Sequence, residues 1–473
     1  MQKPLVLDVG SHELQIGIAG EEEPRIIIPT LIGVKKSAMQ MRMVQDLINQ
    51  SGLNLNKEIY FGEDALNRFI GLDIKRPLEA SNIRNEDHLK LLVEHALFQL
   101  NLKKPLNRHV LVTCPTLATE RFIMFFMNLF LSELGALGIC FSSQPYLSFL
   151  ANDQQITGLL VELGHSQIQL VAILKGHIIR SDDYSYGGKD VDAYFRQLIA
   201  PKISLNEPIN GVAPAIFIEE MKANMCEIYP GLNLLEIKDD LNKVQKMNKP
   251  HVLPNKETLI LGLERYLANE ILFRSELVGK EKSIPDMIYE CVEKCDKDIR
   301  APLYQNIFIA GGLAKIPNMA ERIEKELDYF LPHTIEPKVR IILDNPSIST
   351  WVGGSKLAIN DKFEQVVLKA TKFLAEDEIG INSVMYPTFE KLKIFTPPIH
   401  TFLSPIPEIY KSKEVKLILK FVEKSNILKF RDLADYFGKG LSDIISIFMK
   451  LLAEGRIHGE IVAEKGEFHK HLT

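Results

Sequence analysis

The feature that most constrains the fold is a strand, turn and strand pattern near the start of the chain, at residues 5–20 (LVLDVGSHELQIGIAG). An apolar run closes at Asp8, Gly10 and Ser11 form a turn, and apolar residues then alternate at the period of a β-strand. The backbone N–H groups of such a turn can hold phosphate oxygens. A carboxylate at its mouth can hold Mg²⁺ through water, because Mg²⁺ keeps part of its water shell. Apolar hairpins with Gly and Ser in the turn are common, so this stretch alone does not identify a binding site.

The same pattern recurs at residues 158–179 (GLLVELGHSQIQLVAILKGHII), where the acid is Glu162 and the turn contains Gly164 and Ser166. Two like hairpins about 150 residues apart predict two copies of one fold. Their facing turns could hold one phosphate chain from both sides, which a single hairpin could not do.

Length and composition agree with a multidomain globular protein. The chain has 473 residues, of which 46% are hydrophobic and 25% charged, with a net charge of −5. This predicts roughly two to four domains and gives no global sign of nucleic-acid binding. The five cysteines are scattered and have no zinc spacing, which favours free thiols in a reducing compartment. No signal peptide is expected. Residues 122–141, the longest apolar stretch, contain polar residues and read as a buried helix and strand, so no membrane span is expected.

Several junctions further along the chain mark positions that could face a ligand. Gln144 stands where a strand meets a helix within residues 139–152. Residues 186–199 (YGGKDVDAYFRQLI) open a helix after a glycine turn, and residues 306–317 (NIFIAGGLAKIP) place a strand and two glycines before a helix. A strand, a glycine turn and a helix N-terminus can form an anion or ligand site. Close backbone packing is the alternative for each Gly-Gly pair, including the one in residues 349–358 (STWVGGSKLA).

With both hairpins and these junctions in this order, the chain resembles the actin family, whose ATPase fold is shared with heat-shock 70 chaperones and with sugar kinases of the hexokinase type. The segments that carry the resemblance are EEEPRIIIPTLIG, YFGEDA, SSQPYLSFLA, YGGKDVDAYF, CDKDIRAPLYQNIFIAGG and STWVGGSKLA. The resemblance covers roughly residues 1–385. It implies an α/β fold with two lobes around a nucleotide cleft, residues 1–156 with a long loop at about 35–57, and residues 157–385.

The resemblance also implies a role for each matching residue. Asp8 and Glu162 would be the paired acids at Mg²⁺ and the hydrolytic water, with Asp8 reaching the metal through water, and Gln144 would position the attacking water. The phosphates of ATP or ADP would be held by turn residues at Gly10, Ser11, Gly164, His165 and Ser166. The adenosine pocket would be lined by Gly188, Lys222, Gly311, Gly312 and Leu313.

Several positions of the site depart from the actin pattern. Where His12, Gln15 and His165 stand, actin has a glycine, a phosphate-contacting lysine and an aspartate. Where Glu219 and Ser347 stand, actin has an arginine and a lysine. These changes alter the charge facing the phosphates and the water network at the metal, while the first acid and the water-positioning glutamine are retained. The sequence therefore predicts ATP binding with slow or absent hydrolysis, at most a weak ATPase.

Two segments bear on filament formation. Residues 35–57 stand where actin has a longitudinal contact loop, but they are longer and different in sequence. Residues 277–282 (LVGKEK) stand at the place of actin's apolar plug and carry three charges in their second half. Charged residues are depleted at interface cores, so we do not expect a tight actin-like filament, although self-association or an actin-family partner stays open.

The end of the chain leaves the family. A proline-rich linker is predicted at residues 386–410, followed at 411–473 by helices at 414–424, 430–437 and 441–454 and a hairpin turning at 464–467. This order predicts a winged helix, and LLAEGRIHGEIV resembles the winged-helix end of PCI-type interaction domains. The third helix offers Lys450 against Asp443 and Glu454, so a protein partner is favoured over DNA.

Three functions remain open at this point. The first is a cytoplasmic, cytoskeletal or scaffold actin-related protein that uses ATP as a structural ligand and binds a protein partner through its winged helix. The second is a nuclear actin-related subunit of a chromatin complex with DNA or histone contacts. The third is a polymerising filament ATPase.

Overall fold

The computed structural model describes residues 2–42, 55–116, 118–152, 157–203, 214–237, 240–253 and 256–373, and near the C-terminus residues 418, 421–422, 427–437, 444, 448, 459–462 and 467–470. The chain divides into two compact units, Met1–Phe395 and Thr396–Thr473. The predicted linker at 386–410 and most of the loop at 35–57 lie outside the described residues.

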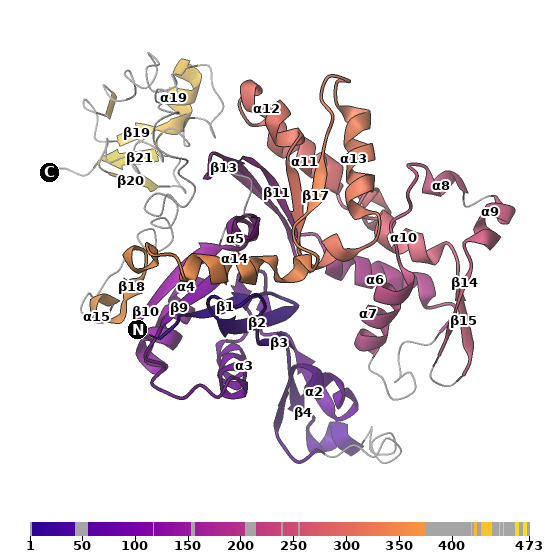
Figure 1. Cartoon of the computed structure of the whole chain (residues 1–473), viewed down its shortest axis with the longest axis horizontal. Helices are drawn as coiled ribbons and strands as arrows, with labels where there is room; N and C mark the ends of the chain where they lie inside the picture. Colours follow the sequence, from indigo (N-terminus) through magenta and orange to yellow (C-terminus); the bar gives the residue numbers. More distant parts are fainter. Residues whose placement is uncertain are drawn as a thin grey trace. The chain divides into compact units, whose positions relative to one another are not determined.

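The first unit contains a six-stranded mixed sheet in the order β18-β10-β9-β1-β2-β3 (Figure 1). Its strands are β1 (Leu5–Val9), β2 (Glu13–Ile18), β3 (Ile26–Pro29), β9 (His109–Cys114), β10 (Gly138–Ser143) and β18 (Leu368–Lys369). The first hairpin forms as predicted: β1 pairs antiparallel with β2, which places Asp8 opposite Gln15, and β1 pairs parallel with β9 on its other side. All five residues of β1 are buried, which explains why four of them are apolar and leaves Asp8 as the one charged residue of the strand.

A second, five-stranded sheet repeats this arrangement in the order β13-β12-β11-β16-β17. Its strands are β11 (Gly158–Leu163), β12 (Ile168–Leu174), β13 (His177–Tyr184), β16 (Ile307–Ala310) and β17 (Val339–Ile341). Here β11 pairs antiparallel with β12, which places Glu162 opposite Gln169, and parallel with β16. In both sheets an acid thus ends the first strand of a hairpin and a glutamine lies opposite it, as expected for two copies of one fold.

Two helices, α5 (Gln144–Ala151) and α14 (Ser349–Ala358), lie together between the sheets (Figure 1). A Cβ atom on Gly353 would lie 1.7 Å from the carbonyl oxygen of Leu147, so the two helix backbones are in direct contact. The Trp351 indole donates to the carbonyl of Val6 at 3.1 Å and packs over Gly17. The glycine pair at 353–354 therefore serves close packing, the alternative that the sequence left open.

The remaining helices cover the sheets or form two smaller subdomains. The helices are α2 (Gly62–Leu66), α3 (Glu86–Gln99), α4 (Glu120–Met127), α6 (Gly188–Ile199), α7 (Pro214–Met225), α8 (Leu234–Ile237), α9 (Leu241–Lys246), α10 (Glu264–Glu270), α11 (Ile284–Glu293), α12 (Lys297–Tyr304), α13 (Met319–Phe330) and α15 (Ala370–Phe373). Short helical turns include η4 (Gly312–Lys315) and η5 (Pro346–Ile348). The apolar stretch at 122–141, expected to be a buried helix and strand, consists of α4, a π-helical turn at Asn128–Glu133 and the first part of β10. Side-chain N-caps stabilise the first turn of several helices. At the start of α3, for example, the Asn85 side chain accepts a hydrogen bond from the His88 N–H.

The smaller subdomains lie on either side of the cleft described below. One is a three-stranded sheet of β4 (Ile32–Lys35), β5 (Ile59–Phe61) and β6 (Leu72–Lys75) with α2. The other joins α6, α7 and α10 to the two-stranded ribbon of β14 (Lys249–Val252) and β15 (Thr258–Leu261). A third pair of strands, β7 (Leu78–Glu79) and β8 (Asn82–Ile83), connects the first of them to α3.

The described part of the second unit contains α19 (Phe430–Phe437) and an antiparallel sheet in the order β19-β21-β20. The strands are β19 (Ile427–Lys429), β20 (Gly459–Val462) and β21 (Glu467–Lys470). Phe430, Phe448 and Phe468 form its aromatic core, with successive ring centroids 5.1 Å apart. A helix at 430–437 and a C-terminal hairpin stand where they are predicted, but most of the helices predicted at 414–424 and 441–454 lies outside the described residues, so the winged helix stays a prediction.

The cysteines and the apolar segments agree with the sequence analysis. All five cysteines are free and buried. Within the described ranges, no helix combines the length and the apolar character needed to cross a membrane.

Candidate functional site

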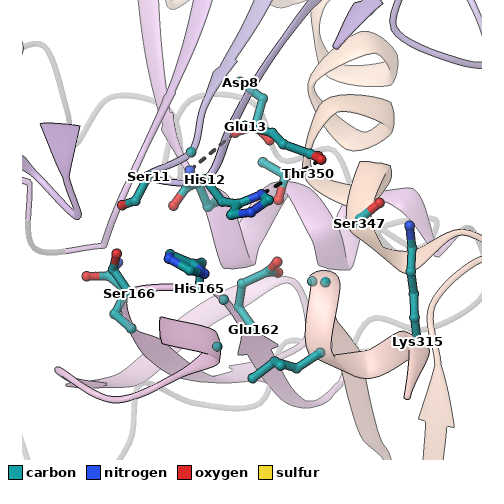
Figure 2. A pocket seen from close by; sticks show the side chains of 18 of the residues that line it. Asp8, Ser11, His12, Glu13, Glu162, His165, Ser166, Lys315, Ser347 and Thr350 are labelled. Atoms are coloured by element: carbon teal, nitrogen blue, oxygen red, sulfur yellow. Dashed lines mark hydrogen bonds and ion pairs between the residues drawn. The ribbon is translucent and has the colours of Figure 1, made fainter. Parts of the chain in front are cut away.

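A cleft of about 580 Å³ lies between the turns of the two hairpins (Figure 2). This volume is typical of small-molecule sites. The structure brings every predicted site residue to its wall: Asp8, Gly10, Ser11, His12, Gln15, Gln144, Glu162, Gly164, His165, Ser166, Gly188, Glu219, Lys222, Gly311, Gly312 and Leu313. Residues so far apart in sequence meet because both sheets present the same end of their hairpins to one space.

The two hairpin turns have the same local structure. Gly10 N–H donates to the carbonyl of Glu13 at 3.0 Å, and Gly164 N–H donates to that of Gln167 at 3.1 Å. A Cβ atom would lie 2.6 Å from the Glu13 oxygen at the first glycine and 2.7 Å from the Gln167 oxygen at the second, so only glycine fits either position. The equivalence shows that the shared sequence pattern encodes a shared turn, and both turns open toward the cleft.

Asp8 lies at the end of a hydrogen-bonded chain that crosses between the hairpins. Its carboxylate accepts from the Thr113 hydroxyl and, at 3.2 Å, from the Gln144 amide, which also donates to the Val9 carbonyl at 3.3 Å. The Gln144 oxygen accepts from the Gln169 amide at 3.4 Å. Both ends of the Gln144 side chain are therefore engaged, one with each hairpin.

Asp8 and Glu162 are both buried, and burial raises the pKa of each. It raises the pKa of Asp8 to about 6, although the hydrogen bonds from Thr113 and Gln144 lower it. Burial, together with the nearby charge of Asp8, raises the pKa of Glu162 to about 8, although a hydrogen bond from Ser148 lowers it. The Glu162 Oε2 atom has no hydrogen-bond partner among the described residues. Burying a carboxylate oxygen without a partner costs free energy, and a divalent cation near these two acids would lower that cost.

The residues present therefore fit Mg²⁺. This ion prefers oxygen ligands, keeps several of its waters and needs only one or two carboxylates from the protein. Within the described ranges no cluster of three or more His, Cys, Asp or Glu residues is arranged to hold a metal, so an ion held by Asp8 and Glu162 would need water for its remaining ligands.

Two histidines face each other across the cleft (Figure 2). The rings of His12 and His165 have centroids 4.8 Å apart and are tilted by 50°. The His12 Nε2 atom contacts a carboxylate oxygen of Glu219 on α7, which joins the first hairpin to the opposite lobe. Burial raises the pKa of Glu219, but the contact with His12 and the charges of Lys222 and Arg76 together outweigh it, so the net shift is downward.

His165 is held in its neutral form. Burial, together with the positive charges of His12, Arg76, Lys222 and Lys189, lowers its pKa to about 3. Its Nδ1 atom lies 3.8 Å from a carboxylate oxygen of Asp192, which is itself paired with Lys222. At neutral pH the second turn therefore presents an uncharged imidazole where the actin pattern has a carboxylate.

The opposite lobe positions its glycines by close contact. Gly311 has φ +86°, and a Cβ atom there would lie 2.6 Å from the carbonyl oxygen of Leu163. At Gly188 a Cβ atom would meet the Cα atom of His165 at 3.3 Å. The turn before η4 and the start of α6 are thus packed against the end of β11 and the second hairpin turn.

Sequence reasoning missed two residues of this site, Thr113 and Lys315. Thr113, which holds Asp8, could have been found from the apolar run HVLVTC that ends before Pro115, because parallel neighbours end at the same sheet edge. The resemblance places Gln169 where actin has a histidine, and the structure places it opposite Glu162, as Gln15 lies opposite Asp8. Lys315, which also lines the cleft, follows the predicted Gly-Gly turn but had no pattern of its own.

Comparison with known proteins adds a family match and several relatives. The family model described as Actin matches residues 1–374. The chain is 24% identical to putative actin-29 of Dictyostelium discoideum over 375 residues, covering 78% of this chain and 94% of that protein. It is 25% identical to centractin of Schizosaccharomyces pombe over 385 residues, covering 80% and 96%. It is 23% identical to actin-related protein 3 of Dictyostelium discoideum over 409 residues, covering 80% and 94%.

Proposed function

The chain belongs to the actin family, and from this premise we propose that it is an actin-related protein that binds MgATP or MgADP in the cleft between its hairpins and hydrolyses ATP slowly or not at all. The observation that carries the proposal is the pair of equivalent turns on one cleft, with a buried acid behind each. Two such turns can hold a phosphate chain from opposite sides.

Asp8 and Glu162 would hold Mg²⁺ with its water shell, and the metal would neutralise charge on the phosphates. Ser11 supports the first turn, because its hydroxyl oxygen accepts the Ala80 N–H at 2.7 Å and its proton stays available to a phosphate oxygen. Thr113 and Gln144 both donate to Oδ1 of Asp8 and so fix that oxygen in place.

Slow hydrolysis is supported by how the catalytic candidates are bonded. Gln144 has to position a water, yet its amide donates to Asp8 and Val9 and its oxygen accepts from Gln169. Freeing either end would cost a hydrogen bond in a partly buried site. The neutral His165 supplies no negative charge to the metal's water shell. The geometry suits retention of a nucleotide better than its cleavage.

In this proposal the nucleotide is a structural ligand and the protein a cytoskeletal or scaffold component in the cytoplasm. A ligand at 100 times its Kd stabilises the folded state by about 2.7 kcal/mol. The C-terminal unit, which lies beyond the family match, would bind a protein partner. Salt-dependent DNA binding by the full chain would instead favour the chromatin alternative.

The test is thermal unfolding of the full chain with MgATP, MgADP, ATP in EDTA, or no ligand, alongside an assay of phosphate release. We expect both magnesium nucleotides to raise Tm by a few degrees and phosphate release to be far below that of actin. Asp8→Asn should abolish the magnesium-dependent part of the shift, while Asp361→Asn at an exposed site should leave it intact. No shift with any nucleotide would overturn the binding proposal, and actin-like turnover would overturn slow hydrolysis.

A further inference from the structure

Gln15 leaves the cleft without a cation at the place where the actin pattern has its phosphate-contacting lysine. Its amide nitrogen donates to the Ser347 carbonyl at 2.9 Å. Its Oε1 atom is buried and has no hydrogen-bond partner among the described residues. One amide N–H is thus used by Ser347, and the second is a neutral donor. Gln15 as positioned therefore offers a phosphate oxygen no positive charge and at most one neutral hydrogen bond.

Most cations near the cleft are already paired. Lys222 contacts Asp192, Lys189 pairs with Glu79 at 2.7 Å, and Arg76 donates to the Ser11 carbonyl at 3.4 Å. The cleft wall meanwhile carries carboxylates at Asp8, Glu13, Glu162 and Glu219. A ligand that brings several phosphates into such a wall needs a further positive charge besides its metal.

Lys315 is a lysine of the cleft wall whose ammonium forms no hydrogen bond or ion pair with the residues that the structure describes. It is the last residue of η4, and its side chain extends toward Ser347, which also anchors Gln15 (Figure 2). A positive charge that β2 lacks is thus available from η4, on the side of the cleft where Ser347 lies.

The backbone that carries Lys315 is held on both sides. Gly311 N–H donates to the Pro346 carbonyl at 2.9 Å, which ties the turn to η5. A Cβ atom on Gly311 would lie 3.0 Å from Glu162 Oε1, so the turn also packs against the second acid. The base of the lysine side chain is therefore fixed relative to both acids of the cleft, and only its flexible end has to move onto a ligand.

We propose that Lys315 is the cation that contacts the phosphate chain of the bound nucleotide, in place of the lysine that position 15 lacks. The inference rests on the proposed nucleotide site and adds to it the residue that makes the site select for phosphates. A contact between an ammonium and a phosphate oxygen is a charge-assisted hydrogen bond, which corresponds to about a 10-fold to 100-fold change in affinity.

The test is calorimetric titration of the full-length wild type, Lys315→Met and the control Lys297→Met with MgADP, AMP and adenosine. Lys297 is an exposed lysine of α12 that does not line the cleft. For Lys315→Met we expect Kd for MgADP to rise about tenfold or more, Kd for AMP to rise less and Kd for adenosine to stay within about twofold. The control should match the wild type, and melting without nucleotide should be the same for all three.

A double variant tests whether the position of the positive charge explains the change in affinity. Gln15→Lys combined with Lys315→Met returns a cation to β2, so its MgADP affinity should recover to within about threefold of the wild type. Unchanged MgADP affinity in Lys315→Met, or an equal loss for adenosine and MgADP, would overturn the inference while leaving nucleotide binding in place. Failure of the wild type to bind any nucleotide would instead overturn the proposed function.

Discussion

The contact between α5 and α14 leads to the sharpest prediction about stability, for Gly353→Ala. A Cβ atom at position 353 would lie 1.7 Å from the Leu147 carbonyl oxygen, 2.4 Å from its carbon and 3.0 Å from the Leu147 Cα atom. These are backbone atoms of α5, so no side-chain rotation can relieve the overlap. Bringing the 1.7 Å approach to 3.0 Å requires the helices to separate by about 1.3 Å.

The cost follows from what those helices join. They contribute to one buried cluster that includes Val6 of the first sheet, Leu160 of the second, and Leu147 and Trp351 between them. Overpacking of a core costs typically about 1–3 kcal/mol, and more when backbones must move. Replacing glycine by alanine inside a helix recovers about 1 kcal/mol of helix propensity. We expect a net loss of about 2–4 kcal/mol in the free energy of unfolding.

Urea unfolding of a graded series of glycine variants measures this loss. Gly354→Ala would meet only side-chain atoms, at 3.0 Å from Val6 and 3.2 Å from Leu111, so its cost should be smaller. Gly312→Ala meets nothing within 4 Å and should be close to neutral. If Gly353→Ala unfolds at the same urea concentration as the wild type, or if Gly354→Ala costs more, the steric reasoning is wrong.

Two further predictions concern buried charges. The pKa of His165 is lowered to about 3 in the folded protein, whereas an unfolded histidine has a pKa of about 6.5. The contribution of His165 to the free energy of unfolding is therefore complete above pH 6.5 and is lost as the pH falls. This contribution decreases by about 2 kcal/mol between pH 6.5 and 5. His165→Asn should lose less stability between pH 7 and pH 5 than the wild type does, as measured by urea unfolding of both proteins. An equal loss in the two proteins would contradict this prediction. Arg322 is fully buried between Glu270 and Glu326, so Arg322→Met should cost about 3–5 kcal/mol by leaving two carboxylates without their cation. A loss below about 1 kcal/mol by urea unfolding would contradict that reasoning.

Local pattern was enough to predict the two hairpins and the residues of both turns. Alternation at period two fixed which residues of each strand face the core, and the acid and glycine positions fixed the hairpin turns. The structure places Asp8 opposite Gln15 and Glu162 opposite Gln169, as the repeat requires. These features lie within about 15 residues of chain, where sequence spacing determines geometry.

Contacts between the lobes could not be predicted in this way. Gln144 is bonded to both Asp8 and Gln169, and His12 contacts Glu219, across large sequence separations. Such pairs depend on how two sheets close on each other, which no local periodicity encodes. Lys315 is a similar case, because the Gly-Gly pattern marked its turn but not the direction of the side chain that follows.

The roles of two glycine pairs also could not be predicted from the local sequence. The pairs at 311–312 and 353–354 look alike in sequence. In the structure Gly353 allows two helices to touch, whereas Gly311 adopts φ +86° to turn the chain beside Glu162. The role of Gly353 depends on the partner helix and that of Gly311 on the local backbone conformation. The three-dimensional contacts are therefore needed to tell these two roles apart.

The departures of the cleft from the actin pattern are bonded to one another, which argues against independent decay of a catalytic site. His12 stands in place of a glycine and contacts Glu219, which stands in place of an arginine. His165 stands in place of an aspartate and faces the ring of His12. Gln15 stands in place of a lysine and donates to Ser347, which stands in place of another lysine. The contacts of His12 join replaced side chains, whereas Gln15 bonds to the backbone carbonyl of Ser347, which any residue at 347 would present. Returning position 165 alone to aspartate should therefore disturb the cleft, because the new carboxylate would face Asp192 and lose the ring contact with His12.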